Sequence, residues 1–149
     1  MVMQLNTVKE LRMFRIVVVA GLFMLTAFSP LSAADRGDSL EHTKDSLETV
    51  KERVKAEKAI LVDVRELVEW NAGHIQRAVL LPWRELQDKP DEKKIREKLP
   101  KDIIVYTYCA VGYRSLRAGK LLTKYGYDVR PLKPGYDELV KAGFKSEKK

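Results

Sequence analysis

Residues 103–115 read IIVYTYCAVGYRS, and this stretch decides the fold class. Its first five residues, Ile103 to Thr107, are apolar, β-branched or aromatic and predict a buried strand. The turn that follows carries the single cysteine of the chain, Cys109, and from Arg114 the apolar residues take helical spacing. A strand, a turn and a helix in this order leave several backbone N–H groups unpaired around the turn, where they can bind an anion.

The neighbours of the cysteine suit a reactive thiolate. Gly112 permits positive φ or close backbone approach, Arg114 supplies a permanent cation, and Ser115 can donate to the sulfur or cap the helix. The cation and the helix N-terminus both favour thiolate over thiol. A small buried structural residue is the alternative, and enclosure of the thiol among apolar side chains would favour it. We predict that Cys109 is a nucleophile.

The N-terminus has the pattern of a secretory leader. Three basic residues precede the apolar run Ile16 to Phe28, and small residues lead up to Ala34. The run is shorter than the ~20 residues of a membrane helix, and Pro30 follows it. We predict a signal peptide over residues 1–34, a single domain over residues 35–149, and export to the periplasm. Membrane anchoring through an uncleaved leader is the alternative.

Charge and cysteine content restrict the partners. The net charge is +7, and because residues 1–34 hold three basic residues and one acidic residue, about +5 is left for the remainder. Basic and acidic residues are interleaved, which suits small anionic substrates and argues against nucleic acid. One cysteine cannot form an internal disulfide in an oxidising compartment. Because His42 and His74 are not in ligand spacing with Cys109, we predict no metal and no other cofactor, and no stable membrane partner after leader removal.

Strand-like and helix-like segments alternate along the domain. The predicted strands are 60–64, 78–81, 103–107 and 129–132. The predicted helices are 45–57, with Asp45 and Glu48 as a capping box, 66–71, 84–89, 91–98, 114–125 and 136–142. The charged tail 145–149 is predicted to fray. This order predicts an α/β fold, with an open, mainly parallel sheet of about five strands and helices on both faces.

Polar residues follow two of the predicted strands. Asp63 and Arg65 lie at the end of one strand and Cys109 lies just past another. Because ligands bind at the carboxyl ends of the strands in open parallel sheets, these residues can converge on one edge. Asp63 and Arg65 either orient the cysteine loop or form a structural ion pair, and the structural role is favoured for Arg65.

Three motifs in this order resemble the small single-domain form of the rhodanese-like sulfurtransferases, over residues 43–144. They are Asp-Val-Arg at 63–65, Glu-Trp-Asn-Ala-Gly-His-Ile at 69–75, and Cys-Ala-Val-Gly-Tyr-Arg-Ser at 109–115. Arg77 and Pro134 stand where this family commonly has glycine, and Leu139 replaces a frequent tryptophan. None of these departures touches the cysteine loop.

The resemblance implies a reaction. Cys109 would take a sulfane sulfur from a small anionic donor such as thiosulfate, hold it as a persulfide, and pass it to a thiol, cyanide or a protein acceptor. Arg114 would hold the loop and attract the oxygens of the donor. Besides these two catalytic residues, the predicted substrate-binding residues are Ala110, Val111, Gly112, Tyr113, Ser115, Asp63 and Arg65.

Other functions are weighed against this one. A persulfide carrier or sensor would load sulfur with little turnover, and a pure interaction module would have no need of Cys109 and Arg114 together. Cysteine phosphatases and arsenate reductases also set a thiolate against an arginine, but they place five residues between the two. Only four residues separate Cys109 from Arg114, which favours sulfur transfer.

Overall fold

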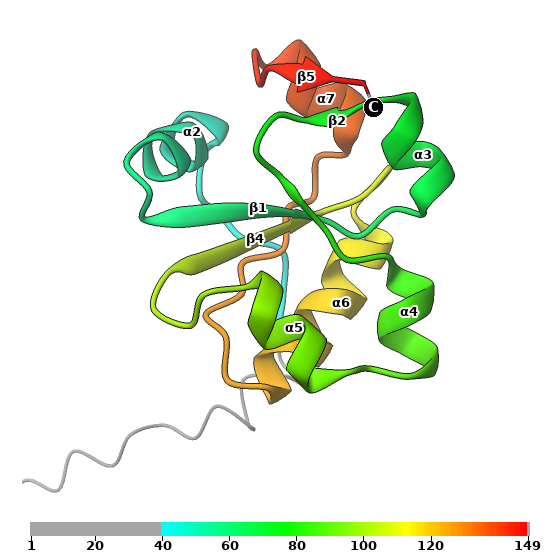
Figure 1. Cartoon of the computed structure of the whole chain (residues 1–149). Coiled ribbons are helices and arrows are strands. Elements are labelled where there is room, and N and C mark those ends of the chain that lie inside the picture. Colours follow the sequence, from blue (N-terminus) through cyan, green and yellow to red (C-terminus); the bar gives the residue numbers. More distant parts are fainter. Residues whose placement is uncertain (1–39, 149) are drawn as a thin grey trace, which may run out of the picture. The chain divides into compact units, whose positions relative to one another are not determined.

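The computed structural model describes residues 40–148, so the predicted leader, residues 1–34, lies outside the described residues. A three-stranded parallel sheet forms the centre of the domain (Figure 1). Its order is β3 (Val79–Leu80), β1 (Ala59–Asp63), β4 (Ile104–Tyr108). The mainly parallel α/β sheet is confirmed, with three strands in place of the expected five or so.

The register of the two long strands sets the position of the site. β1 and β4 pair from Ala59 opposite Ile104 to Asp63 opposite Tyr108. Both strands are largely buried on both faces and are apolar except at Asp63 and Thr107, as expected for strands that are covered by helices above and below. The chain therefore leaves both strands at the same edge, and the segments after Asp63 and Tyr108 begin side by side.

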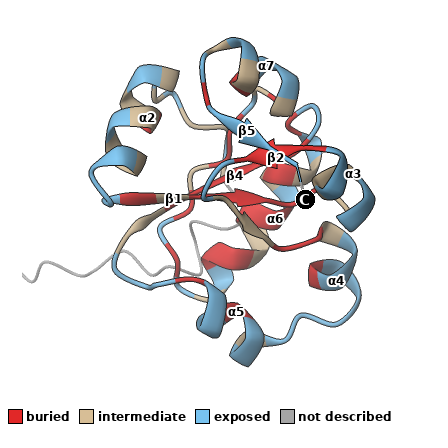
Figure 2. Ribbon diagram, turned by 45° about the horizontal axis from the view of Figure 1, so that its top comes forward, coloured by how far each residue is buried: buried red, intermediate tan, exposed pale blue. Residues whose placement is uncertain are grey.

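Helices cover both faces of the sheet, as predicted. One face packs Leu61 and Tyr106 against α2 (Leu47–Lys55) and α7 (Tyr136–Lys141). On the other face, Val62 and Val105 share an apolar cluster with three helices, α4 (Trp83–Asp88), α5 (Glu92–Lys98) and α6 (Tyr113–Lys124). Figures 1 and 2 show these two groups of helices on opposite sides of the buried strands. Neighbouring residues of a strand point to opposite faces, which makes two cores from one sheet.

Short helices begin and end at identifiable residues. α3 (Leu67–Ala72) begins after a capping box formed by Glu66 and Glu69, and it ends at Gly73. α2 is capped by Ser46, the residue before it, whose Oγ accepts from the Thr49 N–H at 3.1 Å. The predicted capping box of Asp45 and Glu48 is therefore wrong by one residue.

Among residues 40–148, no helix is both long and apolar enough to cross a bilayer.

The C-terminal part differs most from expectation. The predicted strand 129–132 is reduced to a single parallel bridge between Val129 and Val105. The predicted fraying of the tail is also wrong in part, because β5 (Ser146–Glu147) pairs antiparallel with β2 (His74–Ile75). Strands of two residues are too short to show a periodic pattern in the sequence.

Candidate active site

Cys109 is the first residue after β4, at the carboxyl edge of the sheet. Its carbonyl accepts from the Tyr136 N–H at 2.9 Å, which ties the start of the cysteine loop (residues 109–115) to α7. The residue is only 1% exposed and belongs to the apolar cluster of the α6 face, whereas Ala110 and Val111 directly after it are exposed. The thiol is thus enclosed in this conformation, contrary to what a freely accessible nucleophile requires. This enclosure among apolar side chains favours the structural alternative for Cys109, and it restricts access of a donor to the sulfur.

The loop is held in one conformation by contacts at its middle. Gly112 has φ +86°, as predicted, and a Cβ there would lie 2.6 Å from the Lys133 carbonyl oxygen, so glycine is required. Its own carbonyl lies 3.0 Å from His42 Nε2. Ser115 Oγ donates to the carbonyls of Gly112 and Leu132, at 2.6 and 2.7 Å. The hydroxyl of Ser115 therefore hydrogen-bonds to backbone carbonyls. The expectation that it donates to the sulfur or caps the helix is wrong.

The backbone of the loop presents a set of unused donors. The N–H groups of residues 110–115 have no hydrogen-bond acceptor within the described part of the chain. Two of these residues, Gly112 and Ser115, are buried. A buried N–H without a partner costs free energy, and an anion held in the loop would remove that cost. The loop therefore has the donors that an anionic sulfur species needs, at the N-terminus of a 12-residue helix.

Arg114 is engaged by a carboxylate. Its Nη1 and Nη2 donate to the two carboxylate oxygens of Glu69, at 2.6 and 2.8 Å. The same carboxylate accepts from the Glu66 N–H at 2.9 Å. Hydrogen bonds from Arg114 hold the pKa of Glu69 below its usual range, and those bonds raise the pKa of Arg114. In this structure the arginine joins the first turn of α6 to α3 through Glu69.

Asp63 and Arg65 form a second bidentate pair, at the end of β1. Arg65 Nη2 donates to Asp63 Oδ2 at 2.6 Å and to the Gly73 carbonyl at 2.7 Å. Burial alone would lower the pKa of Arg65, but the hydrogen bonds and charge of Asp63 outweigh burial and raise it. The guanidinium lies 4.1 Å from the Tyr136 ring centroid. Because Asp63 is 0% and Arg65 is 5% exposed, the two form a buried ion pair with each other, and neither has a hydrogen bond to residues 109–115 in the described part of the chain.

Several residues that contact the cysteine loop were not predicted from the sequence. Glu69 stood in a quoted motif, but nothing in the sequence paired it with Arg114. Tyr136 and His42 gave no signal, because their contacts join segments far apart in the chain. Gly135 is the clearest omission, since a Cβ there would lie 1.6 Å from the Ala110 carbonyl oxygen.

His74 packs against α3 and pairs with β5. Its ring stacks on Trp70 with centroids 3.6 Å apart, and Nδ1 lies 3.1 Å from the Trp70 carbonyl. Nε2 lies 3.3 Å from Glu147 Oε1 on β5. No group of His, Cys, Asp and Glu side chains within residues 40–148 could hold a metal ion.

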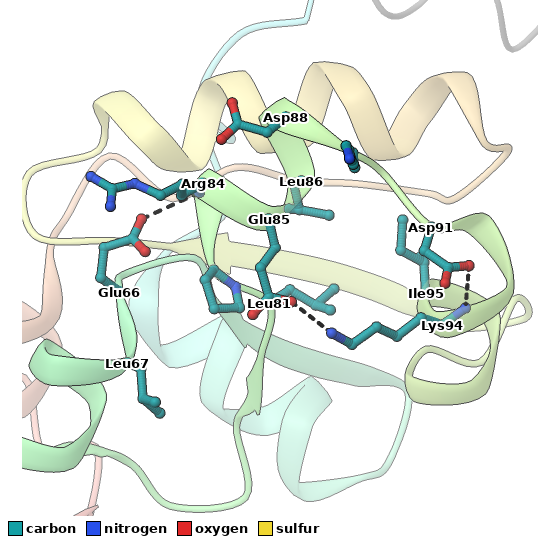
Figure 3. Close-up of a pocket in the computed structure, with 12 residues that line it drawn as sticks. Glu66, Leu67, Leu81, Arg84, Glu85, Leu86, Asp88, Asp91, Lys94 and Ile95 are labelled. Atoms are coloured by element: carbon teal, nitrogen blue, oxygen red, sulfur yellow. Dashed lines mark hydrogen bonds and ion pairs between the residues drawn. The ribbon is translucent and has the colours of Figure 1, made fainter.

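A cleft of about 530 Å³ is lined by residues between Glu66 and Ile95, and neither Cys109 nor any other residue of the cysteine loop lines it (Figure 3). It runs from the start of α3 along α4 and α5, and Glu66 lies at the end nearest the Arg114 pair. Leu81, Leu86 and Ile95 supply its buried apolar floor. Charged side chains of both signs surround it.

The family model of the rhodanese-like domain matches residues 46–142. The chain belongs to the rhodanese-like family. Among curated relatives, the adenylyltransferase and sulfurtransferase UBA4 of Saccharomyces cerevisiae is 38% identical over 89 residues, which cover 56% of this chain and 20% of the yeast protein. The uncharacterized protein YqhL of Bacillus subtilis is 40% identical over 80 residues, covering 53% of this chain and 59% of that protein. This rhodanese-like domain thus spans about a fifth of the yeast relative.

Solved structures agree with the family. The human single-domain sulfurtransferase TSTD1 superposes with a TM-score of 0.57 at 26% identity, covering 65% of this chain and 94% of the human one. A rhodanese-related protein from Thermoplasma volcanium gives 0.56 at 27% identity, covering 68% and 93%. These findings confirm the resemblance and the fold class. They also support sulfur transfer as the general activity of this rhodanese-like domain.

Proposed function

We propose that this protein moves a sulfane sulfur from a thiosulfate-like donor to a thiophilic acceptor through a persulfide on Cys109. The observation that carries the proposal is the set of unused backbone donors at residues 110–115, which begin directly after that cysteine. An ionised sulfur species in the loop would give these donors an acceptor. We further propose that the protein is exported, on the evidence of its leader-like first 34 residues.

The reaction consists of two displacements. In the first, the Cys109 thiolate attacks the outer sulfur of thiosulfate, an S–S bond forms to Cys109, and the original S–S bond breaks with its electron pair leaving on sulfite. In the second, an acceptor such as cyanide attacks the outer sulfur of the persulfide and leaves as thiocyanate, which returns the thiolate. The same backbone N–H groups would stabilise the negative charge on the thiolate and on the persulfide, so they would serve both displacements.

The enclosure of Cys109 favours a second candidate, a persulfide carrier. A residue 1% exposed can load one sulfur during an opening of the loop and then keep it until a partner protein opens the loop again. Phosphatase chemistry is disfavoured, because the four residues between Cys109 and Arg114 make a smaller ring than phosphatases use and Glu69 already occupies the arginine.

Intact mass spectrometry after thiosulfate treatment tests the proposal. We expect a gain of one sulfur atom, located at Cys109 by peptide mapping and absent from Cys109→Ser. Steady-state formation of thiocyanate from thiosulfate and cyanide identifies an enzyme, whereas a stoichiometric persulfide without release identifies a carrier. Absence of any sulfur gain on the wild type, or aryl phosphate hydrolysis exceeding thiosulfate turnover, would refute sulfur transfer.

A further inference from the structure

A second cleft, of about 480 Å³, lies on the face of the sheet that α2 and α7 cover. Its apolar lining consists of the buried side chains of Leu61, Ile75 and Phe144 and of half-buried Val54. All four belong to the apolar cluster of this face, whereas Cys109 belongs to the cluster of the opposite face. No residue of the cysteine loop lines this cleft, so it is separate from the candidate active site.

The charged side chains that line this second cleft all have the same sign. They are Lys51, Lys55, Arg77 and Lys145, and no carboxylate of residues 40–148 lines it. The first cleft, along α4 and α5, is instead lined by charges of both signs. Cations above apolar walls concentrate the positive potential, because the low dielectric of the walls screens it poorly. The chemistry of this lining therefore suits an anion.

Two of the four cations have no partner of opposite charge. The ammonium groups of Lys55 and Lys145 form no ion pair and no hydrogen bond within the described residues. Lys51 is partly engaged, because its Nζ donates to the Ala142 carbonyl at 2.6 Å and lies 3.6 Å from Glu48 Oε1. Lys55 lies in the last turn of α2, where a cation also favours the helix dipole, but Lys145 lies in no helix. An anion that enters the cleft thus meets two free ammonium groups.

The backbone at Arg77 is a separate indication that this lining has a use. Its φ of +65° is left-handed, a conformation that residues other than glycine rarely adopt. Arg77 Nη2 donates to Glu57 Oε1 at 3.0 Å, and its Nε and Nη1 have no acceptor in the part of the chain that the structure describes. Strained residues of this kind gather at binding sites. An arginine on a backbone that suits glycine therefore points to a use for its charge at the cleft.

From this lining we propose that the second cleft binds a small organic anion with an apolar body and one terminal acid group, such as a medium-chain alkyl or aromatic sulfonate, carboxylate or phosphate. The apolar body lies against Leu61, Ile75 and Phe144, and the acid group pairs with Lys55 and Lys145. The volume of about 480 Å³ is within the ~300–1,000 Å³ that is usual for small-molecule sites. This site goes beyond the proposed sulfur transfer, since it uses neither Cys109 nor a persulfide.

Fluorescence titration of the full chain with anilinonaphthalene sulfonate tests the ligand class. We expect saturable binding to the folded protein at one site per chain, and displacement by octanesulfonate but not by methanesulfonate, which has no comparable apolar body. The uncharged probe phenylnaphthylamine should bind at least about tenfold more weakly, because it lacks the acid group. Equal binding of the two probes, or equal displacement by the two sulfonates, would overturn the proposal.

Octanoate and octyl phosphate, used as competitors, identify the preferred acid group. We expect at least one of them to displace the probe as well as octanesulfonate does, since all three present an anion on the same apolar chain. Failure of every octyl anion to displace the probe would overturn the proposal. Displacement by hexaglutamate alone would also overturn it, because the cleft would then dock an acidic protein segment.

Paired substitutions locate the binding site. Lys55→Gln with Lys145→Gln removes the two unpaired charges, so we expect the dissociation constant for anilinonaphthalene sulfonate to rise at least about fivefold. Lys44→Gln with Lys93→Gln is the matched control, because it changes net charge equally at two exposed lysines that do not line the cleft. In this control, binding should stay within about twofold of wild type. Equal losses in the two double variants would show that the probe follows net charge, contrary to the proposal.

Arg77→Gly separates binding from stability. Glycine suits the left-handed backbone, so this variant removes a lining cation without straining the fold. We expect the dissociation constant of the probe to rise severalfold, while the urea midpoint stays at or above that of Arg77→Ala. Unchanged probe binding in Arg77→Gly would contradict the part assigned to this arginine.

Cys109→Ser distinguishes this site from the cysteine loop. Probe binding should equal that of the wild type, because the cysteine and the cleft belong to opposite faces of the sheet. Loss of probe binding in this variant would place the probe at the loop and refute the second site. Failure of sulfur transfer in the wild type would refute the proposed function and leave this site standing.

Discussion

Arg77 has φ +65° and Glu57 has φ +58°, although neither is glycine. A left-handed backbone suits glycine, the residue that the family resemblance implies at position 77, since a Cβ costs about 1–2 kcal/mol there. Arg77 Nη2 lies 3.0 Å from Glu57 Oε1, with both side chains mostly exposed. An exposed pair contributes only about 0–1 kcal/mol, so it offsets the strain in part.

Arg77→Gly should therefore be more stable than Arg77→Ala by about 1 kcal/mol. Both variants lose the ion pair with Glu57, and only alanine keeps the Cβ in a left-handed backbone. Urea denaturation of the two variants measures the difference directly. Equal midpoints and slopes would show that the backbone at this position is not left-handed.

Gly135→Ala should damage the cysteine loop specifically. The new Cβ would lie 1.6 Å from the Ala110 carbonyl oxygen, so the loop backbone must shift. We expect sulfur transfer to fall by more than about tenfold, as when reacting groups are misplaced by about 1 Å. Gly143→Ala controls for destabilisation without a clash, since φ +88° strains the backbone there but the new Cβ would meet nothing nearer than 3.8 Å. If both variants keep full activity, the close approach is absent.

The segment before α2 is fixed to the sheet by one carboxylate. Asp45 Oδ2 accepts from Arg53 at 2.6 Å, from Tyr106 on β4 at 2.6 Å and from Arg130 at 3.0 Å. Burial alone would raise the pKa of Asp45. The hydrogen bonds from Tyr106 and Arg130, with the charges of Arg53 and Arg130, lower it to about 2. The ionised form is therefore favoured in the folded protein.

This shift predicts acid sensitivity with a definite sign. The stabilisation by Asp45 is fully present above the unfolded pKa of about 4 and is lost as pH falls toward 2, because the folded state must then take up a proton that the unfolded state already holds. Urea titrations between pH 5 and pH 2 should show a smaller loss of unfolding free energy for Asp45→Asn than for the wild type. Parallel curves would contradict the shift.

At the scale of the whole molecule, the Arg114–Glu69 pair joins α3 to α6 across the loop that covers Cys109. A half-buried bidentate pair contributes about 1 kcal/mol. We expect Glu69→Ala to accelerate alkylation of Cys109 by iodoacetamide about fivefold, because the enclosed thiol reacts through loop opening. Rates are compared at equal global stability, measured by urea. Unchanged alkylation would show that this pair does not control access.

The same alkylation measurement tests whether Cys109 is a nucleophile. A Cys109 that is structural rather than reactive would alkylate no faster than an ordinary thiol, even after Glu69→Ala opens the loop. Fast alkylation in that variant at neutral pH would separate a protected thiolate from an inert core residue.

Much of the fold was predictable because its signals are local. The apolar runs that became β1 and β4 and the helix from Tyr113 to Lys124 lie within a residue or so of their predicted bounds. The segment 129–132 was predicted to be a strand, which is wrong except for one bridge. Its residues follow β4, with the Arg130 and Leu132 N–H groups bonded to β4 carbonyls, but only Val129 forms a bridge. Strand pairing depends on a partner that the local sequence does not contain.

The sequence by itself determined the parallel α/β order, the placement of Cys109 between a strand and a helix, and the need for a glycine in the turn at Gly112, because each follows from neighbouring residues. The tertiary structure alone decided three features: Glu69 forms an ion pair with Arg114, the Ser115 hydroxyl hydrogen-bonds to backbone carbonyls, and the Cys109 thiol is enclosed. These contacts join residues many positions apart. Their partners are set by how the strands pair and how the helices pack on them, which is a property of the folded chain.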